Sequence, residues 1–105
     1  MNDLEGKVAI VTGASRGIGK AIAENLAAGG AFVLGTATTD TGAASISSYL
    51  AQNGRGFVLR VDEDESIERF FSAIKGEFDA PRILVNNAGI TRDNIALRMK
   101  NDEWG

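Results

Sequence analysis

Short apolar runs alternate with amphipathic segments along the chain. The apolar runs, at residues 7–12, 32–36, 57–61 and 82–85, are rich in Val, Ile, Leu and Phe. Such runs are typical of strands that are buried on both faces of a parallel sheet. In the segments between them, apolar residues recur three or four positions apart, as they do on one face of a helix. The pattern therefore predicts four strands separated by three helices.

The first helix is expected over residues 18–28, with Ile18, Ile22 and Leu26 on its apolar face and glycines 29 and 30 at its end. Asp40 or Thr41 is expected to cap the second helix, and Asp64 or Ser66 the third. The inward-facing residues of these two helices are expected to be Ala43, Ile46, Tyr49 and Leu50, then Ile67, Phe70, Phe71, Ile74 and Phe78. Asn53-Gly54 should stop the second helix, and Pro81 should break the chain before the last strand.

Strands that alternate with helices pair in parallel through right-handed crossovers. The simplest arrangement is a doubly wound (Rossmann) α/β sheet with strand order 3-2-1-4. The fourth strand would then form an edge, although its sequence, RILV, is too apolar for an exposed edge. Residues 1–105 are therefore expected to form the N-terminal half of a larger sheet, and residues 86–105 a loop that leads into a further helix near 102–104.

Composition narrows the possible chemistry. The 105 residues include no cysteine and no histidine, and the net charge is −3. Disulfides, thiol catalysis, zinc ribbons and imidazole ligands are thereby excluded, and no metal site is expected. The acidic balance argues against nucleic-acid or membrane partners. With no apolar run near the ~20 residues of a membrane span and no signal-peptide layout at the N-terminus, a cytoplasmic location is expected.

The first candidate site is the glycine-rich stretch TGASRGIGKA, residues 12–21, between the first strand and the first helix. In such a turn Gly13 would supply a positive φ, Gly17 would let the backbone approach a pyrophosphate, and Gly19 would let the helix pack closely. The N–H groups at the start of the helix favour an anion, and Ser15 and Arg16 add a hydroxyl and a cation. The stretch therefore predicts a phosphate cradle for a dinucleotide.

Two other interpretations of this loop are weaker. A P-loop requires glycine where the chain has Ala14 and a hydroxyl residue where it has Ala21, so that interpretation fails. A glycine-rich turn without a ligand remains possible, but the position between a strand and an amphipathic helix disfavours it.

The choice of dinucleotide depends on the end of the second strand. NAD sites carry an acid there for the ribose 2′-hydroxyl, whereas residues 35–39 read GTATT. Asp40 is the nearest acid, and it would favour NAD only if it turned inward instead of capping a helix. The missing acid, together with Arg16, favours a 2′-phosphate and hence NADP(H).

A second motif follows the fourth strand, where residues 86–94 read NNAGITRDN. By itself NNAG is compatible with a simple turn. Together with T-G-x-x-x-G-x-G, it resembles the short-chain dehydrogenase/reductase family. The stretches VTGASRGIG, GTAT, NNAGITRDN and RMKNDEW resemble most closely the bacterial 3-oxoacyl-[acyl-carrier-protein] reductases of that family, and the resemblance extends over residues 4–104.

The resemblance implies a set of cofactor contacts. The pyrophosphate and adenosine side would be held by Gly13, Ser15, Arg16, Gly17 and Ile18, with Gly19 packing the helix. The 2′-phosphate would lie at Arg16 and Thr38. The adenosine ribose would be lined by Asn87, Ala88 and Gly89, with Ile90 toward the nicotinamide. Arg60 replaces the family's usual Asp or Asn, so adenine is expected to meet Val61 through its backbone.

The family reduces ketones by hydride transfer, with a catalytic tyrosine, a lysine four residues later, a serine and an asparagine. The only tyrosine here is Tyr49, which is followed four residues later by Asn53 and is expected to be a core residue of the second helix. No catalytic residue is therefore expected within the 105 residues.

The resemblance implies that the full-length protein is a homotetramer that uses NADPH to reduce 3-oxoacyl-[acyl-carrier-protein] to the 3-hydroxyacyl form in fatty-acid biosynthesis. This chain alone would then be inactive. Two alternatives remain: another ketone substrate, such as a 3-oxoacyl-CoA, or a nucleotide-binding module without catalysis.

Overall fold

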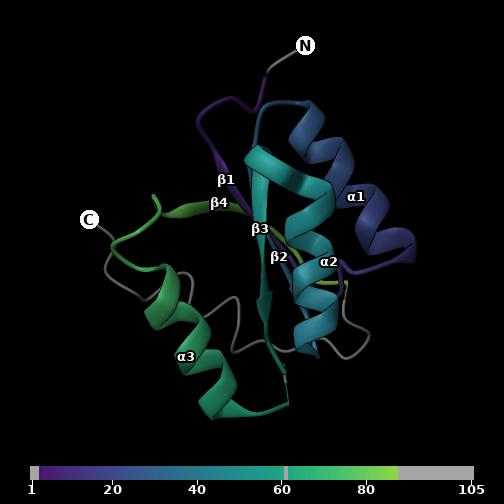
Figure 1. Cartoon of the computed structure of the whole chain (residues 1–105). Helices are drawn as coiled ribbons and strands as arrows, with labels where there is room; N and C mark the ends of the chain where they lie inside the picture. The colour runs from purple at the N-terminus through teal and green to yellow at the C-terminus, as the bar shows by residue number, and fades with distance from the viewer. Residues whose placement is uncertain (1–2, 61, 88–105) are drawn as a thin grey trace.

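The computed structural model describes residues 3–60 and 62–87, which form a four-stranded parallel sheet with helices on both faces (Figure 1). The strand order is β3-β2-β1-β4, which confirms the predicted doubly wound order. The elements in chain order are β1 (Val8–Val11), α1 (Gly17–Ala28), β2 (Phe32–Ala37), α2 (Asp40–Leu50), the 3-10 turn η1 (Ala51–Asn53), β3 (Gly54–Val58), α3 (Asp64–Ile74) and β4 (Pro81–Val85).

Alternate residues of the central strands point into two separate cores. On one face, Ala9, Val11 and Val33 pack with residues of α1 and α2. On the other face, Val8, Ile10 and Leu34 pack with the apolar residues of α3. Figure 1 shows α1 and α2 side by side and α3 apart from them. This arrangement explains why the strands read as continuous apolar runs, because both of their faces are covered.

The third strand begins earlier than the apolar pattern predicts. It was expected over residues 57–61, but β3 spans Gly54–Val58 and pairs with β2 from Val33↔Gly54 onward. Added Cβ atoms would lie 2.3 Å from the Val33 carbonyl oxygen at Gly54 and 2.0 Å from the Ala43 carbonyl oxygen at Gly56. The glycines therefore belong to the strand because α2 and β2 approach it too closely for any side chain.

The helix caps also differ from those expected. Thr39, not Asp40 or Thr41, caps α2, and its side chain accepts a hydrogen bond from the Gly42 N–H at 3.0 Å. Glu63 precedes α3 without a side-chain cap. The Ser66 hydroxyl lies inside α3 and accepts the Arg60 N–H at 2.8 Å, so Ser66 ties the chain after β3 to α3.

The first residue of the predicted α1 stripe does not join the core. Ile18 is 73% exposed, while Ile22 and Leu26 pack against the sheet as expected. Ile18 lies in the first turn of α1, within residues 12–21, the glycine loop.

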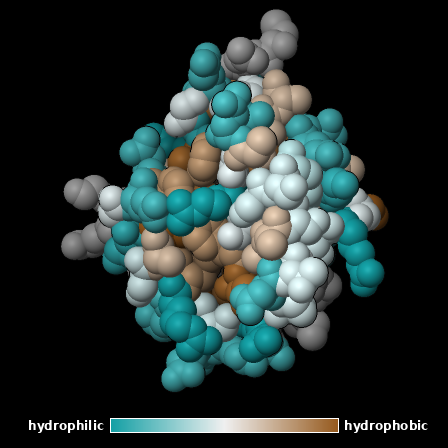
Figure 2. All heavy atoms as spheres, in the orientation of Figure 1, coloured by the Kyte–Doolittle hydropathy of each residue, from teal (hydrophilic) through white to brown (hydrophobic). Residues whose placement is uncertain are grey.

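Phenylalanine rings pack against one another on the face of the sheet that α3 covers. Phe57 meets Phe70 edge-on with ring centroids 5.5 Å apart, and Phe32 stacks on Phe78 at 5.3 Å. Figure 2 shows apolar residues reaching the surface in a hollow beside β3, bordered by polar residues.

No helix within residues 3–60 and 62–87 is long and apolar enough to span a membrane.

Candidate functional site

The turn between β1 and α1 has the backbone that its glycines allow. Gly13 and Gly17 have φ values of +63° and +65°, a region in which side chains are disfavoured. At Gly19, an added Cβ would lie 2.0 Å from the Gly13 carbonyl oxygen and 2.6 Å from Asn87 Nδ2. Gly19 thus lets α1 start directly against the turn and against the chain that follows β4.

This turn presents backbone donors that the described part of the chain does not use. α1 begins after Arg16 with no side-chain cap and no acidic residue in its first turn. The first N–H groups of a helix have no partner within it, and they carry the positive end of its dipole. The N–H of Ser15 has no acceptor among residues 3–60 and 62–87 either. The loop can therefore bind an anion through its backbone.

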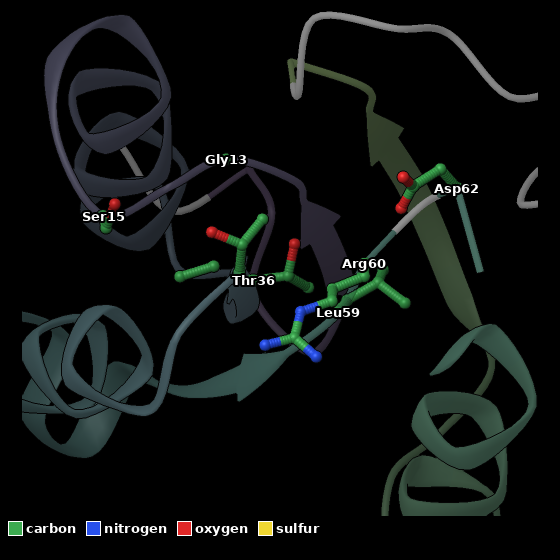
Figure 3. A pocket seen from close by; sticks show the side chains of 8 residues that line it. Gly13, Ser15, Thr36, Leu59, Arg60 and Asp62 are labelled. Atoms are coloured by element: carbon green, nitrogen blue, oxygen red, sulfur yellow. The ribbon is translucent and has the colours of Figure 1, made fainter. Parts of the chain in front are cut away.

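A pocket of about 250 Å³ opens beside this loop, at the carboxyl ends of β1, β2 and β3 (Figure 3). Figure 3 shows the Arg60 side chain extending toward Thr36, with Ser15 on one side of the pocket and Asp62 on the other. Ligands of doubly wound sheets bind outside the carboxyl ends of the strands, where this pocket lies. Its lining residues are Gly13, Ser15, Thr36, Ala37, Thr38, Leu59, Arg60 and Asp62.

The structure brings only some of the predicted site residues together. Gly13, Ser15 and Thr38 line the pocket. Arg16, Gly17 and Ile18 lie on the exposed loop and the first turn of α1, outside the pocket lining, and Gly19 is buried behind them. Val61, Ala88, Gly89 and Ile90 lie outside the described residues.

Asn87 holds the neighbouring strand end in place. Its backbone N–H donates to the Thr12 hydroxyl at 2.8 Å, and its side-chain amide donates to the Gly13 carbonyl oxygen at 3.3 Å. The end of β4 is thereby fixed against the glycine loop.

Within the described residues, no group of three acidic side chains is placed to hold a metal ion.

Sequence reasoning missed several residues of the site. Thr36, Leu59 and Asp62 line the pocket because they end or follow β2 and β3, and that position at the strand ends was the available signal. Tyr49 was predicted to be a core residue only. It does pack against the α1–α2 core, but its hydroxyl also donates to the Ala14 carbonyl oxygen in the glycine loop.

The environment of Tyr49 keeps its hydroxyl protonated. Burial, and then the nearby Glu24 carboxylate, raise the pKa of Tyr49 from 10.0 to about 12. Both effects disfavour the phenolate. Tyr49 therefore remains a hydrogen-bond donor to the loop at any physiological pH.

Comparison with known proteins agrees with this geometry. A family model described as short chain dehydrogenase matches residues 7–105. The chain belongs to the short-chain dehydrogenase family. Members of this family are oxidoreductases that use nicotinamide cofactors.

Curated relatives within the short-chain dehydrogenase family are similar over almost the whole chain. The 3-oxoacyl-[acyl-carrier-protein] reductase FabG of Escherichia coli (strain K12) is 60% identical over 102 residues, and that of Vibrio cholerae is 64% identical over 102. The reductase of the same name from Pseudomonas aeruginosa is 55% identical over 104 residues. The matches cover 96–97% of this chain but only 42% of each relative, so the chain spans less than half the length of the relatives.

Proposed function

We propose that this chain is the dinucleotide-binding part of an NADPH-dependent reductase that converts 3-oxoacyl-[acyl-carrier-protein] to 3-hydroxyacyl-[acyl-carrier-protein]. The observation that carries the proposal is the glycine loop, with two left-handed glycines and a third that meets the Gly13 carbonyl, next to a pocket at the strand ends. This is the arrangement in which a Rossmann fold takes a pyrophosphate.

The residues present fit the cofactor. The N–H of Ser15, which has no acceptor in the described part of the chain, and the start of α1 would hold the pyrophosphate. Thr38 lines the pocket, and Arg16 follows the lining residue Ser15 in the loop; both would meet the 2′-phosphate. Asp40 is an exposed first-turn residue of α2 and does not line the pocket. The absence of a carboxylate from the β2 side of the pocket supports NADPH over NADH.

When bound, the cofactor would supply a hydride. Tyr49 is the only tyrosine in the chain, and its hydroxyl is directed to the Ala14 carbonyl, so it does not serve as the proton donor. The proposal assigns binding to this chain and proton transfer to the portion of the relatives that it does not span. The substrate and a tetrameric assembly are proposed from the relatives' name and the family resemblance.

Titration with NADPH, followed by its fluorescence, tests the binding half of the proposal. NADPH is expected to bind more tightly than NADH, with Arg82→Ala on β4 as a matched control that leaves both affinities unchanged. Absence of binding by either cofactor, or equal binding of both, would contradict the proposal.

The reaction is tested in a protein extended to the length of the relatives. NADPH oxidation is expected with a 3-oxoacyl-[acyl-carrier-protein] and no turnover is expected from the 105-residue chain alone. Preference for the matching 3-oxoacyl-CoA would overturn the substrate assignment while leaving the cofactor assignment standing.

A further inference from the structure

The glycine loop receives a hydrogen bond from a side chain of α2. Ala14 is fully buried, and both of its backbone polar groups are used: its N–H donates to the Thr36 carbonyl oxygen at 2.9 Å, and its carbonyl oxygen accepts from the Tyr49 hydroxyl. One bond comes from β2 and the other from α2. The peptide after Ala14 is thereby fixed between two elements.

The fixed peptide between Ala14 and Ser15 also determines the direction of the Ser15 N–H. A trans peptide is planar, and its C=O and N–H point in opposite directions. Because the Ala14 carbonyl points to Tyr49, the N–H of Ser15 points to the opposite side of the loop. Ser15 lines the pocket while Tyr49 does not, and the Ser15 N–H has no acceptor among residues 3–60 and 62–87.

The side chain of Tyr49 is held in place by its contacts with both α1 and α2. It packs in the core between α1 and α2, and Lys20 Nζ of α1 lies 5.0 Å from the centroid of its ring. The ring is thus held by α1, while the hydroxyl reaches the loop from α2. A phenylalanine would keep the ring contacts and lose only the hydrogen bond, which would leave a buried carbonyl without its donor.

We propose that Tyr49 is a positioning residue of the cofactor site, whose hydroxyl orients the Ala14–Ser15 peptide so that the Ser15 N–H is available to the cofactor's pyrophosphate. This inference rests on the proposed function. It gives a binding role to a tyrosine that is not the catalytic tyrosine of the reaction.

The test compares Tyr49→Phe with Leu50→Val, a buried core control one residue later in the same helix. NADPH affinity is expected to fall roughly tenfold in Tyr49→Phe, as expected for one lost hydrogen bond. Affinity for adenosine 2′-monophosphate, which has no pyrophosphate, is expected to be unchanged. Bound NADPH should slow amide exchange at Ser15 in the wild type and in Leu50→Val, and less so in Tyr49→Phe.

The possible results separate this inference from the proposed function. If Tyr49→Phe binds NADPH like the wild type, or if it loses affinity for both ligands in parallel with Leu50→Val, the positioning role is overturned and the cofactor site stands. If the wild-type chain binds neither ligand, the proposed function fails, and the inference fails with it.

A second measurement does not depend on folding of the variant. Because Tyr49 is the only tyrosine, incorporation of 3-fluorotyrosine labels it alone. NADPH is expected to shift its fluorine NMR signal, while adenosine 2′-monophosphate should leave it in place. A signal that does not respond to NADPH in a chain that binds it would overturn the positioning role.

Discussion

The hydroxyl of Thr12, directly after β1, accepts a hydrogen bond from the backbone N–H of Asn87, the second residue after β4, at 2.8 Å. Thr12 is fully buried, and its hydroxyl also donates to the Asn86 side-chain oxygen at 3.2 Å. Two motifs that lie more than 70 residues apart in the sequence are joined here, at the edge of the sheet where the glycine loop begins. Thr12 therefore links the loop to the residues after β4.

Replacement of Thr12 by Val keeps the shape of the side chain and removes this link. The Asn87 N–H would lose its acceptor, and the free energy of unfolding is expected to fall by about 1 to 2 kcal/mol. Urea denaturation measures the change. The exposed Thr41→Val is the control and is expected to stay within about 0.5 kcal/mol of the wild type. Equal stability of both variants would show that the link contributes nothing.

Gly19 and Gly17 are both loop glycines, but they are required for different reasons. Gly17 has φ +65° and open space around its Cα, so Gly17→Ala carries only backbone strain of about 1 to 2 kcal/mol. Gly19→Ala would place a Cβ 2.0 Å from a carbonyl oxygen, and we expect about 3 kcal/mol from the forced displacement. Denaturant unfolding of both variants tests the order. A smaller loss at Gly19 than at Gly17 would contradict the packing role of Gly19.

The order of the strands and the position of the glycine loop follow directly from the sequence, because they depend on the alternation of apolar runs with amphipathic segments and on glycines between a strand and a helix. The boundaries of β3 do not. Gly54 and Gly56 indicate a break when only local propensity is considered, but tertiary packing against Val33 and Ala43 places them in the strand. Glycines required by close packing cannot be distinguished locally from glycines that end a helix.

The residues of the candidate site also divide into those that the sequence could predict and those that it could not. Gly13 and Ser15 were predicted from the glycine-rich stretch and Thr38 from the family resemblance, and the strand order brings all three to one pocket. The Tyr49 hydrogen bond could not be predicted, because an apolar stripe gives the direction of a side chain but not the polar atom that its end meets. The periodicity of apolar residues also does not fix the first residue of α2 to within one position, so it could not decide whether Thr39 or Asp40 caps the helix.

Tyr49 is expected to titrate with a pKa near 12, above its ordinary value of 10.0, because burial and then Glu24 disfavour the phenolate. A tyrosine with a raised pKa in the folded state stabilises the fold fully below pH 10, and this stabilisation is lost as the pH rises through 12. Ultraviolet absorbance of the phenolate measures the titration directly, since Tyr49 is the only tyrosine. The chain unfolded in urea is the control and should titrate near 10; the same midpoint in the folded chain would refute the burial argument.

Two arginines are available for the 2′-phosphate, and they lie in different places. Arg60 lines the pocket and extends toward Thr36 (Figure 3), whereas Arg16 precedes α1 outside the lining. A guanidinium within reach of a phosphate makes charge-assisted hydrogen bonds. Both cations are exposed, so each contribution is moderated by solvent.

We expect Arg60→Ala and Arg16→Ala each to weaken NADPH binding about fivefold, an effect of about 1 kcal/mol, while NADH affinity changes little. The measured quantity is the dissociation constant of NADH divided by that of NADPH. This ratio cancels losses of affinity that come from altered folding. Arg82→Ala, which removes an exposed cation from β4, should leave the ratio unchanged. A ratio that falls only in Arg16→Ala would place the phosphate at the loop alone. A ratio that falls only in Arg60→Ala would move the selection of NADPH from the glycine loop to the end of β3.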